Sequence, residues 1–261
     1  EIFGHPGLEA DLEVIDLALD CAQAVGLQTP TLDMSDARIV RGLLAGAPID
    51  VSRIHALVEA LAAKELALVS ELSADLPSET RDGLHGLLRM YGGDEVLSVA
   101  EELLPKRPLI SAALRDLRLL ARHVREAYPE VRVGYDLADV GGYSYYSGSR
   151  FAVYAAGSSD ALLRGGRYDE VGAVFGRSRP AVGFSVVDLK ELAERAPVGR
   201  PTPVIRAPWS EDPGLRAAVR QLRQQGESVV CLLPGHDLDG AGFDCDRELV
   251  LTGSTWTVRT L

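Results

Sequence analysis

The sequence predicts an α+β protein with a helical insertion and a small α/β unit at its C-terminal end. Three observations indicate this. A strongly helical stretch runs from about residue 37 to 128, strand-like segments rich in glycine and tyrosine follow between 131 and 187, and prolines and glycine then interrupt the chain between 197 and 203. We therefore expect a core domain at 1–197 and a small α/β domain at 202–261.

Composition fits an ordinary globular protein, with 46% apolar and 25% charged residues in a chain of 261. The net charge of −11 argues against nucleic acid as the main partner, because phosphate binding needs a basic face. Cys21, Cys231 and Cys245 lie far apart without metal-ligand spacing, which predicts no metal site and a reducing, cytoplasmic compartment. Short apolar runs predict no membrane span, and we expect no cofactor. Because the chain opens at Glu1 without Met, a targeting segment or part of the fold could lie upstream.

The first segments predict a strand, a helix and a second strand. Residues 1–3 are strand-like, a glycine-rich turn spans 4–7, and Ile15 and Leu19 recur at helical spacing before Gly26. Residues 29–34 then read as a strand. Between 36 and 128 the pattern is helical: one helix lies within 51–72, and another ends near Met90 before two glycines.

The last helix of this region, after Pro108, is amphipathic. Its core stripe comprises Ile110, Leu114, Leu117, Ala121 and Val124. Its opposite side carries Arg115, Arg118, Arg122 and Arg125, which suits either a nucleic-acid groove or a solvated face interleaved with acidic residues. We favour the solvated face.

The segment 131–156 reads as strand, glycine turn and strand, with Tyr145 and Tyr146 alternating between the two faces of a strand. A further strand precedes Gly165, residues 181–187 form another, and a helix spans 188–196. In the C-terminal unit we expect strands at 204–207 and 228–233, a helix at 214–225, and a hairpin of 249–252 with 255–259.

Three blocks carry the chemistry. They are Gly141-Gly-Tyr-Ser-Tyr-Tyr-Ser-Gly148, Gly165-Gly-Arg-Tyr-Asp169, and Pro180-Ala-Val-Gly-Phe184 followed by Ser-Val-Val-Asp-Leu-Lys190. A single aromatic residue or glycine pair in a strand is usually structural. Together, however, glycines that allow close backbone approach and tyrosines whose hydroxyls donate and accept fit a site for a small polar ligand.

These blocks resemble, in order and spacing, the R-G-L-D-Y-Y, G-G-R-Y-D and G-F-x-x-G-x-E-R motifs of histidyl-tRNA synthetases. The opening Glu1-Ile-Phe-Gly4 is similar to the end of that family's G-x-E-x-F-G motif, so the resemblance covers roughly 1–195. It implies a class II aminoacyl-tRNA synthetase-like antiparallel sheet flanked by helices. It also implies that Glu1 and Tyr146 hold an imidazole, with Tyr168 lining the site. An imidazole offers one donor and one acceptor, which a carboxylate and a phenol can satisfy. Gly142 and Tyr145 complete the candidate histidine-binding set.

The departures from the family all lie on the nucleotide side. The arginine before G-L-D-Y-Y is Gly141 here, the adenine-site glycine is Val187, and the triphosphate-binding arginine is Lys190; the motif's aspartate and glutamate are Ser144 and Leu189. Losing one preorganised charge at such a site typically costs ~10²–10³ in rate. We therefore expect a degenerate ATP site and no synthetase activity.

The resemblance thus implies a non-catalytic regulatory subunit of ATP phosphoribosyltransferase, which activates a short catalytic subunit and senses histidine for feedback inhibition of histidine biosynthesis. The family implies a hetero-octamer with that catalytic subunit, self-association as a dimer and histidine as effector, with no nucleic-acid or membrane partner. Three alternatives remain open: a histidyl-tRNA synthetase, a paralogue that activates another amino acid, and a scaffold that senses no ligand.

Overall fold

The structure is a computed structural model that describes residues 1–158, 160–196, 204–235 and 245–261. It forms two compact units, Glu1–Ala196 and Pro197–Leu261, which are treated separately below. The linker expected at 197–203 lies outside the described residues. No helix in the described part of the chain is both long and apolar enough to cross a bilayer.

The larger unit is built on a seven-stranded sheet with the order β1-β7-β6-β5-β2-β4-β3. Its strands are β1 (Ile2–Phe3), β2 (Thr31–Asp36), β3 (Tyr91–Gly92), β4 (Arg132–Asp136), β5 (Ser149–Tyr154), β6 (Leu163–Arg167) and β7 (Ala181–Val186). The expected antiparallel sheet is confirmed for all pairs except β2 and β4, which are parallel. A parallel pair needs a long crossover, and the helical insertion between these two strands supplies it.

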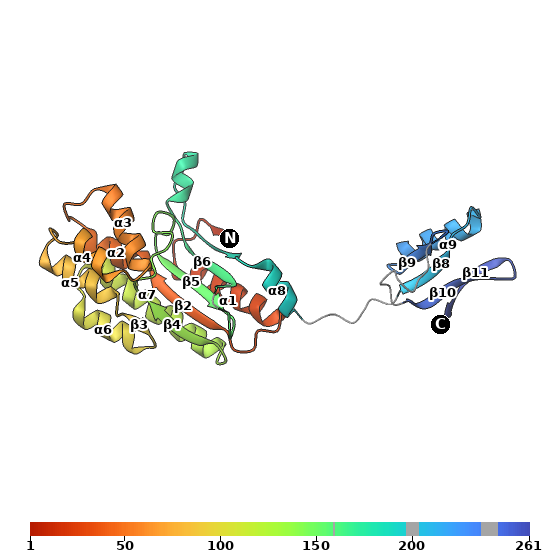
Figure 1. Cartoon of the computed structure of the whole chain (residues 1–261), viewed down its shortest axis with the longest axis horizontal. Helices are drawn as coiled ribbons and strands as arrows, with labels where there is room; N and C mark the ends of the chain where they lie inside the picture. Colours follow the sequence, from red (N-terminus) through yellow and green to blue (C-terminus); the bar gives the residue numbers. More distant parts are fainter. Residues whose placement is uncertain (159, 197–203, 236–244) are drawn as a thin grey trace. The chain divides into compact units, whose positions relative to one another are not determined.

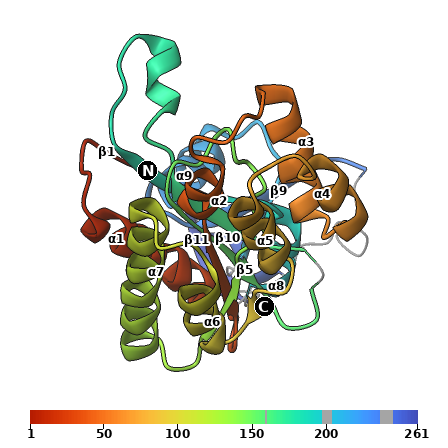
Figure 2. The same ribbon diagram turned by 90° about the vertical axis from the view of Figure 1, so that its left-hand side faces the viewer.

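Helices cover the sheet and gather at one end of it (Figure 1). They are α1 (Leu8–Ala24), α2 (Ala37–Leu44), α3 (Val51–Ala62), α4 (Leu66–Leu72), α5 (Ser78–Leu87), α6 (Glu95–Leu103), α7 (Pro108–Ala127), the 3₁₀ helix η1 (Val171–Phe175) and α8 (Leu189–Arg195). Long helices α1 and α7 run side by side, whereas α3, α4 and α5 form a separate cluster (Figure 2). The predicted core stripe of α7 is fully buried, so its apolar face packs in the main core.

The arginine-bearing side of α7 carries local ion pairs. Arg118 pairs with Glu101 and Arg125 with Asp94, both from the neighbouring α6 segment, while Arg115 contacts Asp116. These exposed pairs agree with a solvated, charge-balanced face.

Two local predictions are wrong. The helix expected to reach Met90 ends at Leu87, and Tyr91–Gly92 instead form an edge strand against β4. The tyrosines expected on a strand lie in a turn, and β5 begins only at Ser149. The reason is Gly142, whose φ of +74° reverses the chain; the amides of Tyr145 and Tyr146 both donate to its carbonyl. Consecutive residues in such a turn do not alternate as they would on a strand.

In its described residues, 204–235 and 245–261, the smaller unit consists of a four-stranded sheet with the order β11-β10-β8-β9 and one helix. Its elements are β8 (Val204–Pro208), α9 (Pro213–Gln224), β9 (Ser228–Leu232), β10 (Cys245–Thr252) and β11 (Thr255–Thr260). β10 and β11 form the expected antiparallel hairpin. A small core around Ile205, Leu215 and Leu249 holds the unit together.

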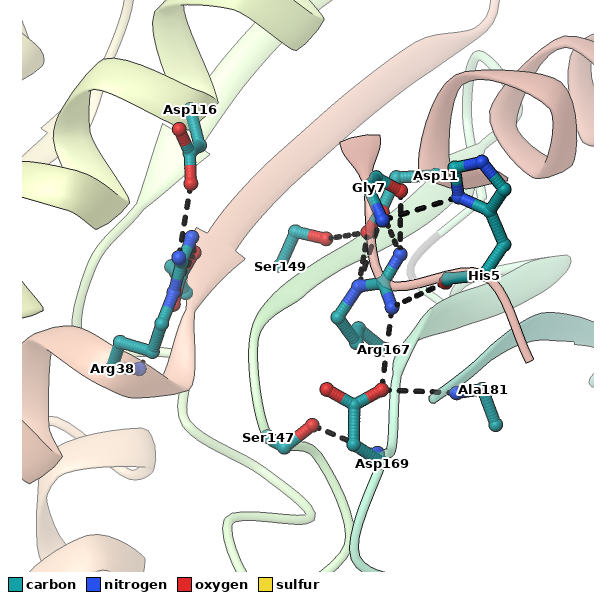
Figure 3. Close-up of polar contacts among 11 residues, drawn as sticks. His5, Gly7, Asp11, Arg38, Asp116, Ser147, Ser149, Arg167, Asp169 and Ala181 are labelled. Carbon is teal, nitrogen blue, oxygen red and sulfur yellow. Dashed lines mark hydrogen bonds and ion pairs between the residues drawn. The ribbon is translucent and has the colours of Figure 1, made fainter. Parts of the chain in front are cut away.

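A buried ion pair links the start of the chain to the middle of the sheet (Figure 3). Arg167, at the end of β6, pairs with Asp11 of α1, and both side chains are at least nine-tenths buried. The same guanidinium donates to the carbonyls of His5 (3.2 Å) and Gly7 (3.0 Å), and Ser149 donates to Asp11. Because every partner is hydrogen-bonded, the pair avoids an uncompensated buried charge.

Asp169 continues this network toward the sequence blocks singled out above. Its carboxylate accepts from Arg167 (3.3 Å) and from the amide of Ala181 (2.9 Å), while its own amide donates to Ser147. A single aspartate thus connects β6, β7 and the end of the turn that carries Tyr143, Tyr145 and Tyr146, called the tyrosine turn below.

A second, largely buried network joins the end of β2 and the start of α2 to α7. Asp36 caps α2 by accepting from the amide of Arg38, whose guanidinium bridges Asp36 to Asp116 (Figure 3). It fixes the position at which α2 leaves the sheet.

Replacing Arg167 with Met tests the role of the buried pair. It leaves the buried Asp11 carboxylate without its guanidinium partner, so we expect the free energy of unfolding to fall by about 3–5 kcal/mol. Urea denaturation measures this. The control Arg81→Met removes a surface arginine whose ion pair with Asp82 is long and exposed, and should cost about 1 kcal/mol or less. Equal losses in the two variants would contradict the assigned role.

Candidate functional site

Tyr168 and Glu1 form the centre of the candidate site. The Tyr168 hydroxyl donates to a Glu1 carboxylate oxygen at 2.7 Å, although the two residues are 167 positions apart. Tyr168 directly follows Arg167 and is 5% exposed. The buried ion pair therefore fixes the backbone from which this phenol projects.

Two tyrosines of the turn extend the cluster. The Tyr145 ring stacks on Tyr168 with centroids 4.9 Å apart and an interplanar angle of 26°. Tyr146 meets Tyr145 edge-on at 5.1 Å. Such stacked and edge-to-face pairs are favourable aromatic geometries, and they leave the hydroxyls of Tyr168 and Tyr145 near the Glu1 carboxylate.

Two glycines leave the space that the cluster occupies. A Cβ at Gly183 would lie 2.7 Å from Cγ of Glu1 and 3.2 Å from the Tyr168 hydroxyl. A Cβ at Gly142 would lie 3.1 Å from the Tyr146 ring, in a residue that also has positive φ. Close approach is therefore the physical reason for glycine at both positions.

The environment keeps the phenols neutral. Burial first, and then the bond to Glu1, raises the pKa of Tyr168 well above its ordinary value. Burial likewise raises the pKa of Tyr145, with Tyr146 and Glu1 adding to the effect. Both hydroxyls therefore keep their protons at neutral pH and remain available as donors and acceptors.

The five residues expected to bind histidine lie close together. Glu1 contacts Tyr168, Tyr168 stacks on Tyr145, and Tyr145 contacts Tyr146. Gly142 leaves room for the Tyr146 ring. One detail differs from expectation. The side chain that bonds Glu1 is Tyr168, whereas Tyr146 joins the cluster through Tyr145. Tyr146 was expected on a strand, on the face opposite Tyr145, but it lies at the end of a turn, so its ring meets that of Tyr145 edge-on.

Sequence reasoning missed Arg41, which holds the turn from the helical insertion. It projects from α2, and its guanidinium donates to the carbonyls of Tyr143 (2.7 Å) and Tyr146 (3.0 Å). It also lies 4.5 Å from the centroid of the Tyr143 ring, a cation–π contact. Nearby, Ser144 meets His55 of α3 at 3.2 Å. Neither Arg41 nor His55 belongs to a motif, so no sequence signal identified them.

It also missed an acidic cluster beneath the turn. Asp33 of β2 lies with Asp136 and Asp139 beside the buried Arg150, whose guanidinium pairs with Asp139. Burial first, then repulsion from Asp136 and Asp139, raises the pKa of Asp33 to about 6. The parallel pairing of β2 and β4, which brings Asp33 and Asp136 together, was not foreseen.

Among the described residues, no group of buried, unpaired cationic side chains surrounds the three positions expected to mark a degenerate nucleotide site. Gly141 lies beside Arg150, but that guanidinium is engaged by Asp139. Val187 follows β7 and is 53% exposed, and Lys190 projects from α8 with its side chain 86% exposed beside Glu194. A lysine this solvated gives little preorganised charge.

A sheet flanked by helices, with a polar aromatic cluster beside strands β1, β7 and β6, defines a protein of the class II synthetase-like fold. The family model for histidyl-tRNA synthetase matches residues 1–192. A solved ATP phosphoribosyltransferase regulatory subunit/histidyl-tRNA synthetase from Bacillus halodurans C is 27% identical, with a TM-score of 0.70 over 92% of this chain and 64% of that one. A histidyl-tRNA synthetase from Nostoc shares the fold, with a TM-score of 0.69 at 20% identity over 95% of this chain and 64% of its own.

The C-terminal unit distinguishes between the two families that share this fold, the synthetases and the regulatory subunits. Residues 202–259 match the family model described as the ATP phosphoribosyltransferase subunit HisZ C-terminal domain. The regulatory subunits from Acidovorax sp. (strain JS42) and Variovorax paradoxus are 50% and 51% identical over the whole chain, which spans 67% of each. The chain therefore belongs to the family of ATP phosphoribosyltransferase regulatory subunits, which are non-catalytic partners in histidine biosynthesis.

Removing Arg41 should loosen the tyrosine turn. In Arg41→Met, residues 139–147 lose two backbone anchors, so we expect faster hydrogen exchange at the amides of Tyr145 and Tyr146, by about tenfold, with β5 unchanged. Exchange mass spectrometry on the intact protein measures this. Arg53→Met, which removes an arginine anchor from the α3–α4 region, is the control. Unchanged exchange in the turn would show that Arg41 does not hold it.

Asp33 gives a pH-dependent prediction. The folded chain holds this proton between about pH 4 and 6 and the unfolded chain releases it, so the free energy of unfolding falls as pH rises through that window. Asp33→Asn removes the penalty, and we expect it to stabilise the protein by about 2 kcal/mol near pH 7, after allowance for partial exposure, and by almost nothing near pH 4. Urea unfolding across pH, with exposed Asp82→Asn as control, measures the difference. Destabilisation by Asp33→Asn near pH 7 would contradict the assigned repulsion.

Proposed function

We propose that this chain senses histidine through the cluster of Glu1, Tyr145, Tyr146 and Tyr168 and passes the signal to a short catalytic subunit of ATP phosphoribosyltransferase. The observation that carries the proposal is the hydrogen bond between Tyr168 and Glu1 within a stack of tyrosines. Family membership supplies the regulatory role, and the cluster supplies the ligand chemistry.

The cluster suits an imidazole. A neutral imidazole carries one N–H donor and one acceptor nitrogen. The Glu1 carboxylate can accept the first, and a phenol can donate to the second. Tyr145 is 42% exposed, so the part of its ring that Tyr168 leaves uncovered offers stacking area for the flat ring and would also attract an imidazolium through a cation–π contact.

Occupancy of this cluster has a direct structural route to the helical insertion. The turn that carries Tyr145 and Tyr146 is held by Arg41 of α2 and touches His55 of α3. A ligand that prefers one arrangement of the turn biases α2 and α3 by its differential affinity for the two arrangements. The regulatory signal would then reach a partner bound against those helices.

Assembly with the catalytic subunit follows from the family. A solved ATP phosphoribosyl transferase (HisG:HisZ) complex from Thermotoga maritima shares the fold over 70% of this chain, with a TM-score of 0.54. We propose the same partnership here, within a hetero-octamer that contains dimers of the regulatory subunit, in the cytoplasm. The synthetase alternatives are disfavoured by Gly141, Val187 and the solvated Lys190.

Calorimetry tests the proposal. We expect histidine to bind and ATP to give no measurable heat. Tyr168→Phe removes the hydrogen bond that holds the Glu1 carboxylate in position to accept the imidazole N–H, so histidine affinity should fall about tenfold. The control Tyr91→Phe changes an exposed tyrosine on β3, the strand farthest from β1 in the sheet order, and should leave affinity unchanged.

The possible outcomes separate the competing functions. ATP binding with histidine-dependent pyrophosphate exchange would restore the synthetase, and exchange with another amino acid would indicate a paralogue. Binding of neither ligand would leave a scaffold without sensing. Equal histidine affinity in Tyr168→Phe and the unmodified protein would place the ligand outside this cluster.

A further inference from the structure

The smaller unit contains a pocket that the regulatory site does not involve. It lies between α9 and the ends of β8 and β9 and has a volume of about 300 Å³. We call it the Trp209 pocket, after the indole that follows β8. The residues that matter in it are Trp209, Arg216, Val219, Arg220, Arg223 and Leu215.

Its floor is apolar and its wall is aromatic. Leu215 and Val219 are buried against the small core, where they form the inner face of α9. Trp209 is 47% exposed, so much of the indole remains open to solvent. An apolar side chain of a partner could therefore bury its surface against both the indole and the apolar floor, as at the energetically dominant positions of many interfaces.

Its rim is cationic. Arg216, Arg220 and Arg223 follow one another at helical spacing along one side of α9, and all three are exposed. Arg223 is held in place by donating to the carbonyl of Val229 on β9 at 2.9 Å. The pocket lining includes no carboxylate.

These arginines differ from the others in the described part of this unit. Arg206 and Arg259 pair with Glu248, and Arg247 pairs with Glu227. Within residues 204–235 and 245–261, no ion pair is formed by the three arginines of the pocket. The chain has a net charge of −11, so these three neighbouring arginines form a local positive patch on an acidic protein. Such a patch favours binding of a negatively charged group.

We propose that the Trp209 pocket binds an acidic peptide segment of a partner protein, with one apolar side chain of that segment inserted against Leu215, Val219 and the indole. Carboxylates on either side of the inserted residue pair with Arg216 and Arg220. Tryptophan and arginine are the residue types that most often dominate protein interfaces, and guanidinium groups recognise carboxylates through paired hydrogen bonds. A small inorganic anion would leave the apolar floor and the indole uncovered.

Fluorescence anisotropy with the full chain tests this inference. The probe is a short fluorescein-labelled peptide in which glutamates flank a central phenylalanine, and its companion carries glutamine at every glutamate position. We expect saturable binding of the acidic peptide that weakens with salt. Affinity should fall about tenfold in Arg216→Gln/Arg220→Gln and also in Trp209→Ala.

The matched control is Arg259→Gln, which lowers the charge of the same unit away from the pocket and should change affinity less than about twofold. Circular dichroism of each variant checks that the unit remains folded. Equal weakening in Arg259→Gln, equal binding of the glutamine peptide, or lack of saturable binding would overturn the proposal. So would displacement of the peptide by inorganic phosphate at matched ionic strength, which would indicate a simple anion site. None of these results depends on histidine binding, so the two proposals stand or fall separately.

Discussion

The buried pair between Arg167 and Asp11 is the interaction on which the rest of the larger unit depends. It joins β6 to α1, and the same guanidinium holds the carbonyls of His5 and Gly7 in the turn after β1. The strand that directly follows Glu1 and the strand that leads to Tyr168 are thereby held in one arrangement. A buried pair of this kind adds little net stability against an apolar replacement, but it specifies geometry, which is what a ligand site requires.

This ion pair positions the residues of the candidate site through direct neighbours. Tyr168 is adjacent to Arg167, Gly183 leaves room for Glu1 beside it, and Tyr145 stacks from the turn. At the positions expected to mark a degenerate nucleotide site, the described cationic groups are less organised, since Arg150 is paired with Asp139 and Lys190 is largely exposed. The unit thus contains an ordered group of polar aromatic side chains, which we propose as the histidine site.

The candidate site could be predicted from the sequence because its glycines, which allow close approach, and its tyrosines, which can hydrogen-bond a ligand, cluster in three short blocks. The core stripe of α7 was predictable for a similar reason, since helical periodicity records burial directly. The tyrosine turn was not, because β-rich composition favoured a strand and only the backbone of Gly142 decides otherwise. Arg41 and Asp33 were missed because their roles arise from contacts across about a hundred residues, which no local pattern encodes.

An imidazole bound next to Glu1 would lie within reach of Tyr168, which Arg167 positions, and of the tyrosines in the turn that Arg41 holds. A crystal structure of the protein grown with histidine tests that placement most directly. We expect density for the ring bounded by the Glu1 carboxylate and the side chains of Tyr145, Tyr146 and Tyr168. Ordered histidine at any other location on the chain, with this cluster unchanged, would contradict it.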